Sequence, residues 1–354
     1  MRILLLSRYD RLGASSRVRS FQYLPFLKSM GWEVKVSPLF SNQYIKAFYD
    51  GKSHLLPALA GYMRRLRVLM GTGKYNLIWI EKEIFPFMPA LFELLMEKSS
   101  IPYVVDYDDA IFHRYDRHPR LLVRMALGKK INCVMRSAAM VIAGNDYISH
   151  WARQAGAKSV VIVPTVVDME RYKLRDKKSV DSSLVIGWIG SPATTRYLSI
   201  LEPAFEAISR NHQVRFVAIG ADKKALKNSA MIAQPWTEET EVQSIQGFDI
   251  GIMPLVDSPW ECGKCGYKLI QYMACGLPVV ASTVGVNKQI VEHGLNGFLA
   301  NNLNEWREAF EQLINDHRLR QRMGMYGRKK VEKWYSVQAQ VPRLEKLFRE
   351  ILIL

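Results

Sequence analysis

A glycine-rich basic stretch in the last third of the chain has residues suited to binding an anion. The segment GKCGYKLIQYMACGLPVVAS, residues 263–282, places Lys264 and Lys268 around a helix predicted to begin near Tyr267. The first N–H groups of a helix and its positive dipole end attract anions, whereas a lysine in the first turn is unfavourable without one. Gln271 shares a face with Lys268 one turn later, within reach of a sugar hydroxyl if a phosphate binds the helix start. The competing interpretation is a glycine-rich loop with solvent-exposed lysines.

A cluster of acids follows an apolar run in the first half of the chain. In VVDYDDAIFHRY, Asp106, Asp108 and Asp109 come at the end of a predicted strand. Open α/β sheets bind ligands at the carboxyl ends of their strands, so these carboxylates are candidates for a site. Clustered carboxylates also cap helices and form turns, which is the alternative interpretation.

The order of apolar runs and helical patterns predicts two α/β domains. The 354 residues exceed one ordinary core, and short apolar runs alternate with helical patterns in a βαβ rhythm that restarts after the polar stretch 171–183. We therefore expect two successive doubly wound domains, 1–165 and 166–333, with 171–183 near their junction as a linker. A helix over about 334–354 is expected to pack back on the first domain.

The positive charge of the chain is concentrated in two stretches. The net charge is +16, and no carboxylate occurs in residues 51–80 or 117–145, where Arg and Lys alternate with Leu, Met, Val and Tyr. Such segments suit the surface of an anionic bilayer, with the apolar side shallowly inserted. A solvated basic face is the alternative. Nucleic acid is not expected as a partner, because no helix-turn-helix, zinc-finger or RNP-like pattern accompanies the charge.

The start of the chain and the cysteines predict a cytoplasmic protein. The opening MRILLLSRYD has four consecutive aliphatic residues, too few for a signal peptide or a membrane span. Four cysteines in so long a chain do not form a disulfide framework. Cys262 and Cys265 are a poor zinc half-site, because no second pair or suitably spaced histidines accompany them.

The ordered set of motifs in the second half resembles a known enzyme family. CGYKLIQYMACGLPVVASTVGVNKQIVEHGLNGFLA, residues 265–300, resembles the donor-binding signature of family 4 glycosyltransferases, and VIVPTVVDMERY, LVIGWIGSPATTRYL and FDIGIMPL resemble it more loosely. These are retaining enzymes of the GT-B fold. The resemblance implies two tandem doubly wound, Rossmann-like domains facing a central cleft. The first would bind the acceptor, and the second the nucleotide-sugar donor.

Two positions depart from the family pattern. The family has two glutamates eight residues apart, the first on donor-sugar hydroxyls and the second on the nucleotide ribose. Gly263 and Gln271 stand there in this chain. Gln271 retains the capacity to hydrogen-bond a ribose, whereas the donor-sugar contact must come from elsewhere, with Glu261 or backbone groups as candidates.

The resemblance also implies residues around the donor. The family places an Arg and a Lys in the loop after the first strand of the second domain, to neutralise the pyrophosphate. Ser191 stands at the first position and Arg196 near the second, so Lys268 or Lys264 is expected to compensate. Trp236 is expected to contact the nucleobase by analogy. The alternatives are a surface role for Arg196 and a core role for Trp236.

In the first domain, the loop DRLGASSRVRS resembles the glycine-containing loop that lies against the donor. Gly13 is suited to close backbone approach, and Arg17 and Arg19 to an acceptor phosphate unless both are solvated. Similar enzymes present a histidine near the position of Asp108. Asp108 and Asp109 are therefore the catalytic candidates, to stabilise oxocarbenium charge or hold the acceptor hydroxyl.

The resemblance predicts transfer with retained configuration, in which the acceptor hydroxyl attacks as the nucleotide diphosphate leaves from the same face. A UDP-sugar is the favoured donor. A lipid-linked or polysaccharide acceptor at the cytoplasmic face of the membrane is expected. Asp106 and Asp108 have the spacing of the metal-binding pair of the other major glycosyltransferase fold, but tandem doubly wound halves argue against that fold, so no metal is expected. A nucleotide-sugar 2-epimerase and a non-catalytic nucleotide-sugar-binding protein are the alternatives.

Overall fold

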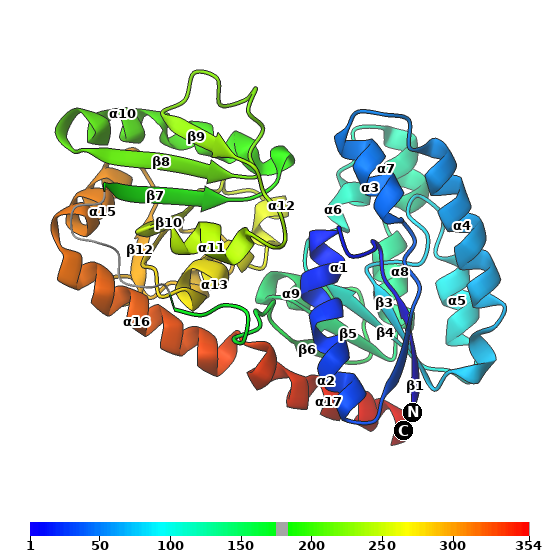
Figure 1. Ribbon diagram of the computed structural model, residues 1–354. Helices are drawn as coiled ribbons and strands as arrows, with labels where there is room; N and C mark the ends of the chain where they lie inside the picture. The colour runs from blue at the N-terminus through cyan, green and yellow to red at the C-terminus, as the bar shows by residue number, and fades with distance from the viewer. Residues whose placement is uncertain (175–182, 354) are drawn as a thin grey trace. The chain divides into compact units, whose positions relative to one another are not determined.

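The computed structural model describes residues 1–174 and 183–353. Residues 175–182 of the predicted linker lie outside the described residues. Each of two compact units contains a parallel sheet that is six-stranded over the described residues, with helices on its faces (Figure 1). Two doubly wound α/β units were predicted, and these sheets confirm them. The first unit comprises Met1–Val166, Gly263–Cys265 and Ala339–Leu354, and the second Val167–Cys262 and Gly266–Gln338. The short segment Gly263–Cys265 thus belongs to the first unit, although the predicted boundary puts it in the second domain.

The first unit has strand order β2-β1-β3-β4-β5-β6. Its strands form because runs such as Leu77–Ile80 are apolar on both faces and are completely or almost completely buried, as expected for a parallel sheet covered by helices. Its elements are β1 (Arg2–Leu6), α1 (Ala14–Arg19), η1 (Phe21–Tyr23), α2 (Leu24–Ser29), β2 (Glu33–Val36), α3 (Asn42–Tyr49), α4 (Leu55–Leu69), η2 (Thr72–Lys74), β3 (Leu77–Glu81), α5 (Leu91–Glu97), β4 (Tyr103–Tyr107), α6 (His113–Asp116), α7 (Leu121–Leu127), α8 (Lys130–Ser137), β5 (Met140–Ala143), α9 (Asp146–Gln154), β6 (Val160–Ile162) and most of α17 (Val337–Ile353).

The C-terminal helix α17 completes the core of the first unit. Phe348 is completely buried and lies edge-on to Trp32 and Trp79, with ring centroids 6.2 Å and 5.2 Å away. The indole nitrogen of Trp32 donates a hydrogen bond to Glu345 (3.1 Å). Aromatic pairs of this geometry contribute beyond their buried area. Among the described residues, no helix combines the length and the apolar character that crossing a membrane requires.

The second unit has strand order β12-β11-β10-β7-β8-β9. Its elements are β7 (Leu184–Ile189), η3 (Pro192–Leu201), α10 (Glu202–Asn211), β8 (Val214–Ile219), β9 (Met231–Gln234), α11 (Glu241–Gln246), β10 (Ile250–Met253), α12 (Pro259–Cys262), α13 (Tyr267–Ala274), β11 (Val279–Ser282), α14 (Asn287–Ile290), β12 (Gly297–Ala300), α15 (Leu303–Asn315) and α16 (His317–Trp334).

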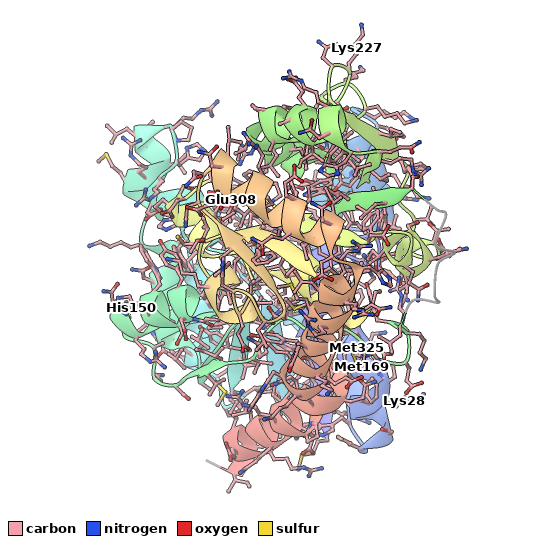
Figure 2. All side chains as sticks on the ribbon, turned by 90° about the vertical axis from the view of Figure 1, so that its left-hand side faces the viewer. Lys28, His150, Met169, Lys227, Glu308 and Met325 are labelled. Carbon is pink, nitrogen blue, oxygen red and sulfur yellow. The ribbon has the colours of Figure 1, made fainter. Side chains whose placement is uncertain are left out.

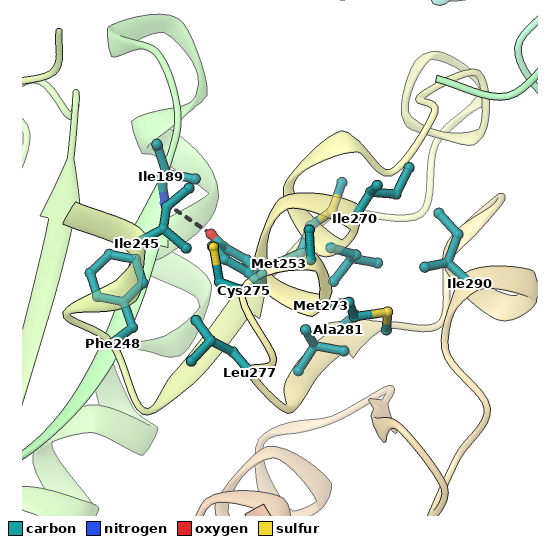
Figure 3. Close-up of a cluster of buried hydrophobic side chains, with 14 of the residues drawn as sticks. Ile189, Ile245, Phe248, Met253, Ile270, Met273, Cys275, Leu277, Ala281 and Ile290 are labelled. Atoms are coloured by element: carbon teal, nitrogen blue, oxygen red, sulfur yellow. Dashed lines mark hydrogen bonds between the residues drawn. The ribbon is translucent and has the colours of Figure 1, made fainter. Parts of the chain in front are cut away.

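Helix α13 is fixed in the core of the second unit by its inner face. Ile270 and Met273 are completely buried among apolar side chains of the sheet and of α14 (Figure 3). The hydroxyl of Tyr272 accepts a hydrogen bond from the backbone N–H of Ile189 at the end of β7 (2.9 Å), drawn as the dashed line in Figure 3. Helix α13 is therefore tied to the carboxyl end of β7 through Tyr272.

Helix α16 packs directly on the turn that follows α13. A Cβ atom on Gly324 would lie 1.9 Å from the carbonyl oxygen of Gly276, a distance that no real Cβ contact shows. Arg328, one turn later on α16, donates hydrogen bonds to the carbonyls of Tyr172 (2.6 Å) and Ala274. The close approach needs glycine because backbone, rather than a flexible side chain, occupies the space.

We predict that Gly324→Ala lowers the free energy of unfolding by about 2 kcal/mol or more, since overpacking against backbone outweighs the helix propensity gained. Met325→Ala is the control, because Met325 is 44% exposed on the same helix and should change stability by less than about 1 kcal/mol (Figure 2). Urea denaturation measures both variants. Equal stability of the two would contradict the described packing.

Candidate functional site

The strand order of each sheet determines where a ligand is most readily bound. In an open α/β sheet, ligands bind outside the carboxyl ends of the strands at the point where the strand order reverses. In the first unit this point lies between β1 and β3, and in the second between β7 and β10. We therefore describe the loops that follow these four strands.

In the second unit, the loops after β7 and β10 meet at an ion pair. Arg196 Nη2 lies 3.6 Å from Glu261 Oε1 and donates a hydrogen bond to the Tyr197 hydroxyl (3.2 Å). The Arg196 side chain is 70% exposed, whereas that of Glu261 is 3% exposed and also accepts hydrogen bonds from Tyr197 and Ser258. Glu261 is thus held within the protein, and Arg196 presents a cation to solvent at the switch point.

Lys268 lies at the start of α13, close to the end of β7. Its Nζ is 5.4 Å from the centroid of the Trp188 ring, within the range of a cation–π contact. The helix begins after Gly266, which has a left-handed φ of +64°, and among the described residues no side chain caps this end. The predicted pair Arg196 and Lys268 therefore belongs to the second unit, with Arg196 in η3, the first element after β7, and Lys268 in α13, the second element after β10.

Trp236 and Gln271 are joined through two residues that the sequence did not suggest. The Trp236 indole donates a hydrogen bond to Glu241 (2.9 Å), the Tyr172 hydroxyl donates to the same carboxylate (2.6 Å), and Gln271 Nε2 donates to Tyr172 (2.7 Å). Gln271 is 2% exposed, so its amide group faces this network rather than solvent. The left-handed Gly220 after β8 packs against Trp236, which places the indole at the carboxyl edge of the sheet.

In the first unit, the end of β3 supplies a lysine to the predicted catalytic acids. Lys82 Nζ lies 2.9 Å from Asp108 and 3.6 Å from Asp109. Lys82 is 5% exposed and has a left-handed φ of +67°, which is uncommon for a residue with a side chain. Ser15 Oγ lies 2.7 Å from Glu81 and 2.8 Å from Asp108, so its single proton can be donated to only one of them at a time.

The two acids of this pair differ in their proton affinity. Burial alone would raise the pKa of Asp108, but the charge of Lys82 and its hydrogen bond outweigh burial and hold that pKa below its usual range. Burial and the neighbouring Asp108 raise the pKa of Asp109. Lys264, predicted as a donor ligand, lies 4.0 Å from Asp109 within the first unit. The arrangement suits one permanently ionised carboxylate beside one that holds a proton more readily.

A second ionic cluster lies beside the first. Glu83 is 2% exposed and accepts from Arg8 (3.0 Å), Lys130 (2.6 Å) and the Tyr115 hydroxyl (2.7 Å). Burial would raise its pKa, but the two cations outweigh burial and lower it. The charged triplet Glu81–Glu83 directly follows the apolar run of β3, which marks it as a candidate for this edge of the sheet but does not indicate its partners.

The predicted role of Arg19 is wrong. Arg19 is 2% exposed, and its Nε and Nη2 donate to Asp106 at 2.9 Å and 2.7 Å, while Nη1 donates to the carbonyl of Val163 (2.8 Å). A buried guanidinium with these partners cannot meet an acceptor phosphate, and it is not solvated. Arg17 is 6% exposed with Nη1 3.4 Å from the carbonyl of Arg11, so its acceptor role remains a prediction.

Packing within the first unit requires glycine at positions 13 and 263. A Cβ atom on Gly13 would lie 2.2 Å from Cβ of Tyr9, and one on Gly263 would lie 2.4 Å from Cβ of Ala110. The carbonyl of Gly263 accepts a hydrogen bond from Asn145 (2.9 Å). A side chain at position 263 would thus displace Ala110.

Comparisons with known proteins find glycosyltransferases. Residues 183–316 match the family model described as Glycosyl transferases group 1. The chain is 38% identical to an uncharacterized glycosyltransferase of Methanocaldococcus jannaschii over 24% of this chain and 25% of that protein. It is 26% identical to the capsular polysaccharide biosynthesis glycosyltransferase CapM of Staphylococcus aureus over 52% and 51%, respectively. The match to these curated relatives thus spans a quarter to about half of their length.

Among solved structures, the Anabaena protein HepE in complex with UDP-glucose has a similar fold. The TM-score is 0.72 at 16% identity, with 99% of this chain and 100% of that chain covered. The fold of the chain is therefore GT-B. The match of residues 183–316 to the group 1 glycosyl transferase model and the GT-B fold confirm the predicted resemblance to GT-B glycosyltransferases.

We predict that Arg19→Met lowers the free energy of unfolding by about 3 kcal/mol at pH 8, because it leaves the buried Asp106 carboxylate without its cation. Burial raises the pKa of Asp106 to about 6 even with Arg19 present, and further without it. Because the pKa of Asp106 is higher in the folded protein than in the unfolded chain, keeping Asp106 ionised lowers the free energy of unfolding at a pH above that pKa. Protonation at lower pH removes this cost. The loss should therefore be smaller at pH 5, as measured by urea denaturation. A loss independent of pH would contradict the pairing.

Proposed function

We propose that the protein is a retaining glycosyltransferase that moves a sugar from a nucleotide-diphosphate sugar, with a UDP-sugar favoured, to a saccharide acceptor. The observation that carries the proposal is the pair of cations in the segment that matches the group 1 model: Arg196, in η3 after β7, and Lys268, in the first turn of α13, whose start no side chain caps among the described residues. Fixed positive charge and backbone N–H groups stabilise the charge that develops on a departing diphosphate. HepE, a protein of the same fold, is described in complex with UDP-glucose.

The predicted nucleoside contacts fit one network. Trp236 would border the base, and the ribose would bind beside Tyr172 and Glu241, the residues that already hold Gln271. The Gln271 amide donates a hydrogen bond to the Tyr172 hydroxyl. Gln271 would therefore have to give up this hydrogen bond in order to donate one from the same N–H to a ribose hydroxyl. Tyr172 and Glu241 therefore join the candidate donor residues.

Asp108 and Asp109 are the proposed catalytic acids of the first unit. Ionised Asp108 would hold the acceptor hydroxyl or stabilise oxocarbenium charge as the nucleotide diphosphate departs from the same face. Lys82 would act as a positioning residue, because it keeps Asp108 ionised and fixes its orientation. No metal is required in this proposal, since Arg196 and Lys268 supply the charge for the leaving group.

The acceptor is proposed to be a lipid-linked sugar or a growing polysaccharide at the cytoplasmic face of the membrane. The long basic stretches without carboxylates support contact with anionic lipid. CapM, a similar protein, is named for capsular polysaccharide biosynthesis. Incubation with UDP-, GDP- and ADP-sugars distinguishes this proposal from the alternatives: acceptor-dependent release of nucleotide supports a transferase, isomerised sugar indicates a 2-epimerase, and binding without turnover indicates a non-catalytic protein.

We predict that Arg196→Ala and Lys268→Ala each lower kcat by about 100-fold with little change in thermal stability, as expected for loss of a leaving-group contact. Lys227→Ala is the matched control, because Lys227 is an exposed lysine of the second unit outside η3 and α13 (Figure 2). Steady-state kinetics with and without EDTA measure both expectations. Turnover at the level of the control in both variants would refute the diphosphate assignment, and loss of activity with EDTA would refute the metal-free mechanism.

A second prediction concerns the pH dependence of turnover. Lys82→Met removes the cation that lowers the pKa of Asp108, so the acidic limb of the kcat/KM profile should move to higher pH. Lys82→Arg keeps the charge and should leave the limb close to its original position. If Lys82→Met lowers stability or rate without moving the limb, Lys82 is merely structural.

A further inference from the structure

Helix α4 exposes an apolar face. Leu55, Leu56, Leu59 and Met63 are 73%, 77%, 59% and 48% exposed, and their spacing puts them on one side of the helix. A surface helix normally turns its apolar stripe to the core and its polar residues to water. Here large aliphatic side chains face solvent, and exposed apolar patches of this kind mark interaction sites.

The loop after β3 adds a ring to this face. Phe87 is 53% exposed and has a left-handed φ of +57°, a conformation that costs free energy for an aromatic residue. Three hydrogen bonds hold the loop: Tyr62 of α4 donates to the carbonyl of Pro86 (2.7 Å), Lys130 donates to the carbonyl of Phe85, and the Phe87 N–H donates to Tyr115. The surrounding structure thus enforces a strained backbone that leaves the Phe87 ring outside the core.

Helix α7 carries further exposed apolar side chains next to this loop. The ring centroids of Phe87 and His118 are 6.3 Å apart, and His118 lies one turn before α7. Leu121, Leu122 and Met125 of α7 are 59%, 79% and 74% exposed. The loop that carries Phe87 thus contacts α4 through Tyr62 and the start of α7 through His118. These contacts connect three exposed apolar segments within the first unit: α4, the loop and α7.

Exposed cations outnumber carboxylates around these segments, where Asp50 precedes α4 and Asp116 precedes α7. Between β2 and the C-terminal half of α4, a hollow of about 470 Å³ is lined by Lys35, Arg64, Arg67 and Lys74, and the residues around it include no carboxylate among those described. Arg117, Arg120 and Lys129 are exposed at the two ends of α7. A self-associating dimer would bring like charges together, whereas phosphate headgroups complement them.

We propose that this face docks the first unit onto an anionic phospholipid bilayer. The leucines of α4 and α7 and the Phe87 ring insert among the upper acyl chains, and the hollow beside α4 binds headgroup phosphates. We define the lipid-facing surface as Leu55, Leu56, Leu59, Met63, Phe87, Leu121, Leu122 and Met125. The biological reason for docking rests on the proposed function, because a lipid-linked acceptor is reached at a membrane.

Flotation with vesicles tests the inference without donor or turnover, so its failure and the failure of the transferase assignment are separate results. The full chain is mixed with vesicles of phosphatidylglycerol and phosphatidylcholine or of phosphatidylcholine alone, at low and high salt. The wild type should float with the anionic vesicles at low salt and lose at least tenfold in partitioning at high salt or without phosphatidylglycerol.

Matched variants identify the surface. Leu56→Ser with Leu59→Ser should reduce partitioning at least tenfold, and Leu56→Met with Leu59→Met should retain it. Ile232→Ser with Leu295→Ser is the control, because these residues are 56% and 40% exposed in the second unit and should leave flotation unchanged. Circular dichroism checks that each variant is folded, and Arg67→Gln should reduce partitioning about fivefold at low salt.

Three outcomes overturn the inference. The first is equal flotation of the serine variant and the wild type, and the second is equal binding to neutral vesicles. The third is a dimer in light scattering that the serine variant abolishes while vesicles fail to bind, since the face would then join two copies of the chain.

Discussion

Polar groups at the carboxyl ends of parallel strands determine the character of both units. The strand order brings the loops after β1 and β3, and those after β7 and β10, to one point in each sheet. In the first unit the charges there are buried, so they must be paired: Lys82 with Asp108, Arg19 with Asp106, and Arg8 and Lys130 with Glu83. In the second unit, Glu261 is buried and Arg196 is largely exposed, so a cation remains available to an anionic ligand.

In the proposed function, this difference gives the two units different parts in one reaction. A site built from mutually neutralised charges holds its carboxylates in defined protonation states, which suits residues that act on a hydroxyl or on a developing sugar cation. A site with an exposed cation and an uncapped helix start suits a diphosphate. The departures from the family pattern fit this account, because Gly263 packs against Ala110 and Gln271 serves the network of Tyr172 and Glu241.

The sequence predicted the fold because burial patterns are local. Short apolar runs such as Leu77–Ile80 are typical of strands buried on both faces, and their alternation with helical patterns predicted the parallel sheets. The sequence likewise placed Asp108 and Asp109 at the end of a strand. It did not reveal Lys82, Tyr172 or Glu241, because their partners lie 26, 99 and 69 positions away and pairing depends on the tertiary fold. Arg19 was misjudged for the same reason, since nothing near it in sequence indicates the buried Asp106.

The central claim is that the carboxyl edge of the second sheet, with the start of α13, binds the diphosphate of the donor. Hydrogen–deuterium exchange of the full chain, with and without saturating UDP, tests this claim most directly, with uridine as the comparison. Slower exchange over residues 190–197 and 266–271 with UDP, and much less with uridine, is the predicted result. Bound UDP that leaves both segments unprotected and slows exchange elsewhere would contradict the account.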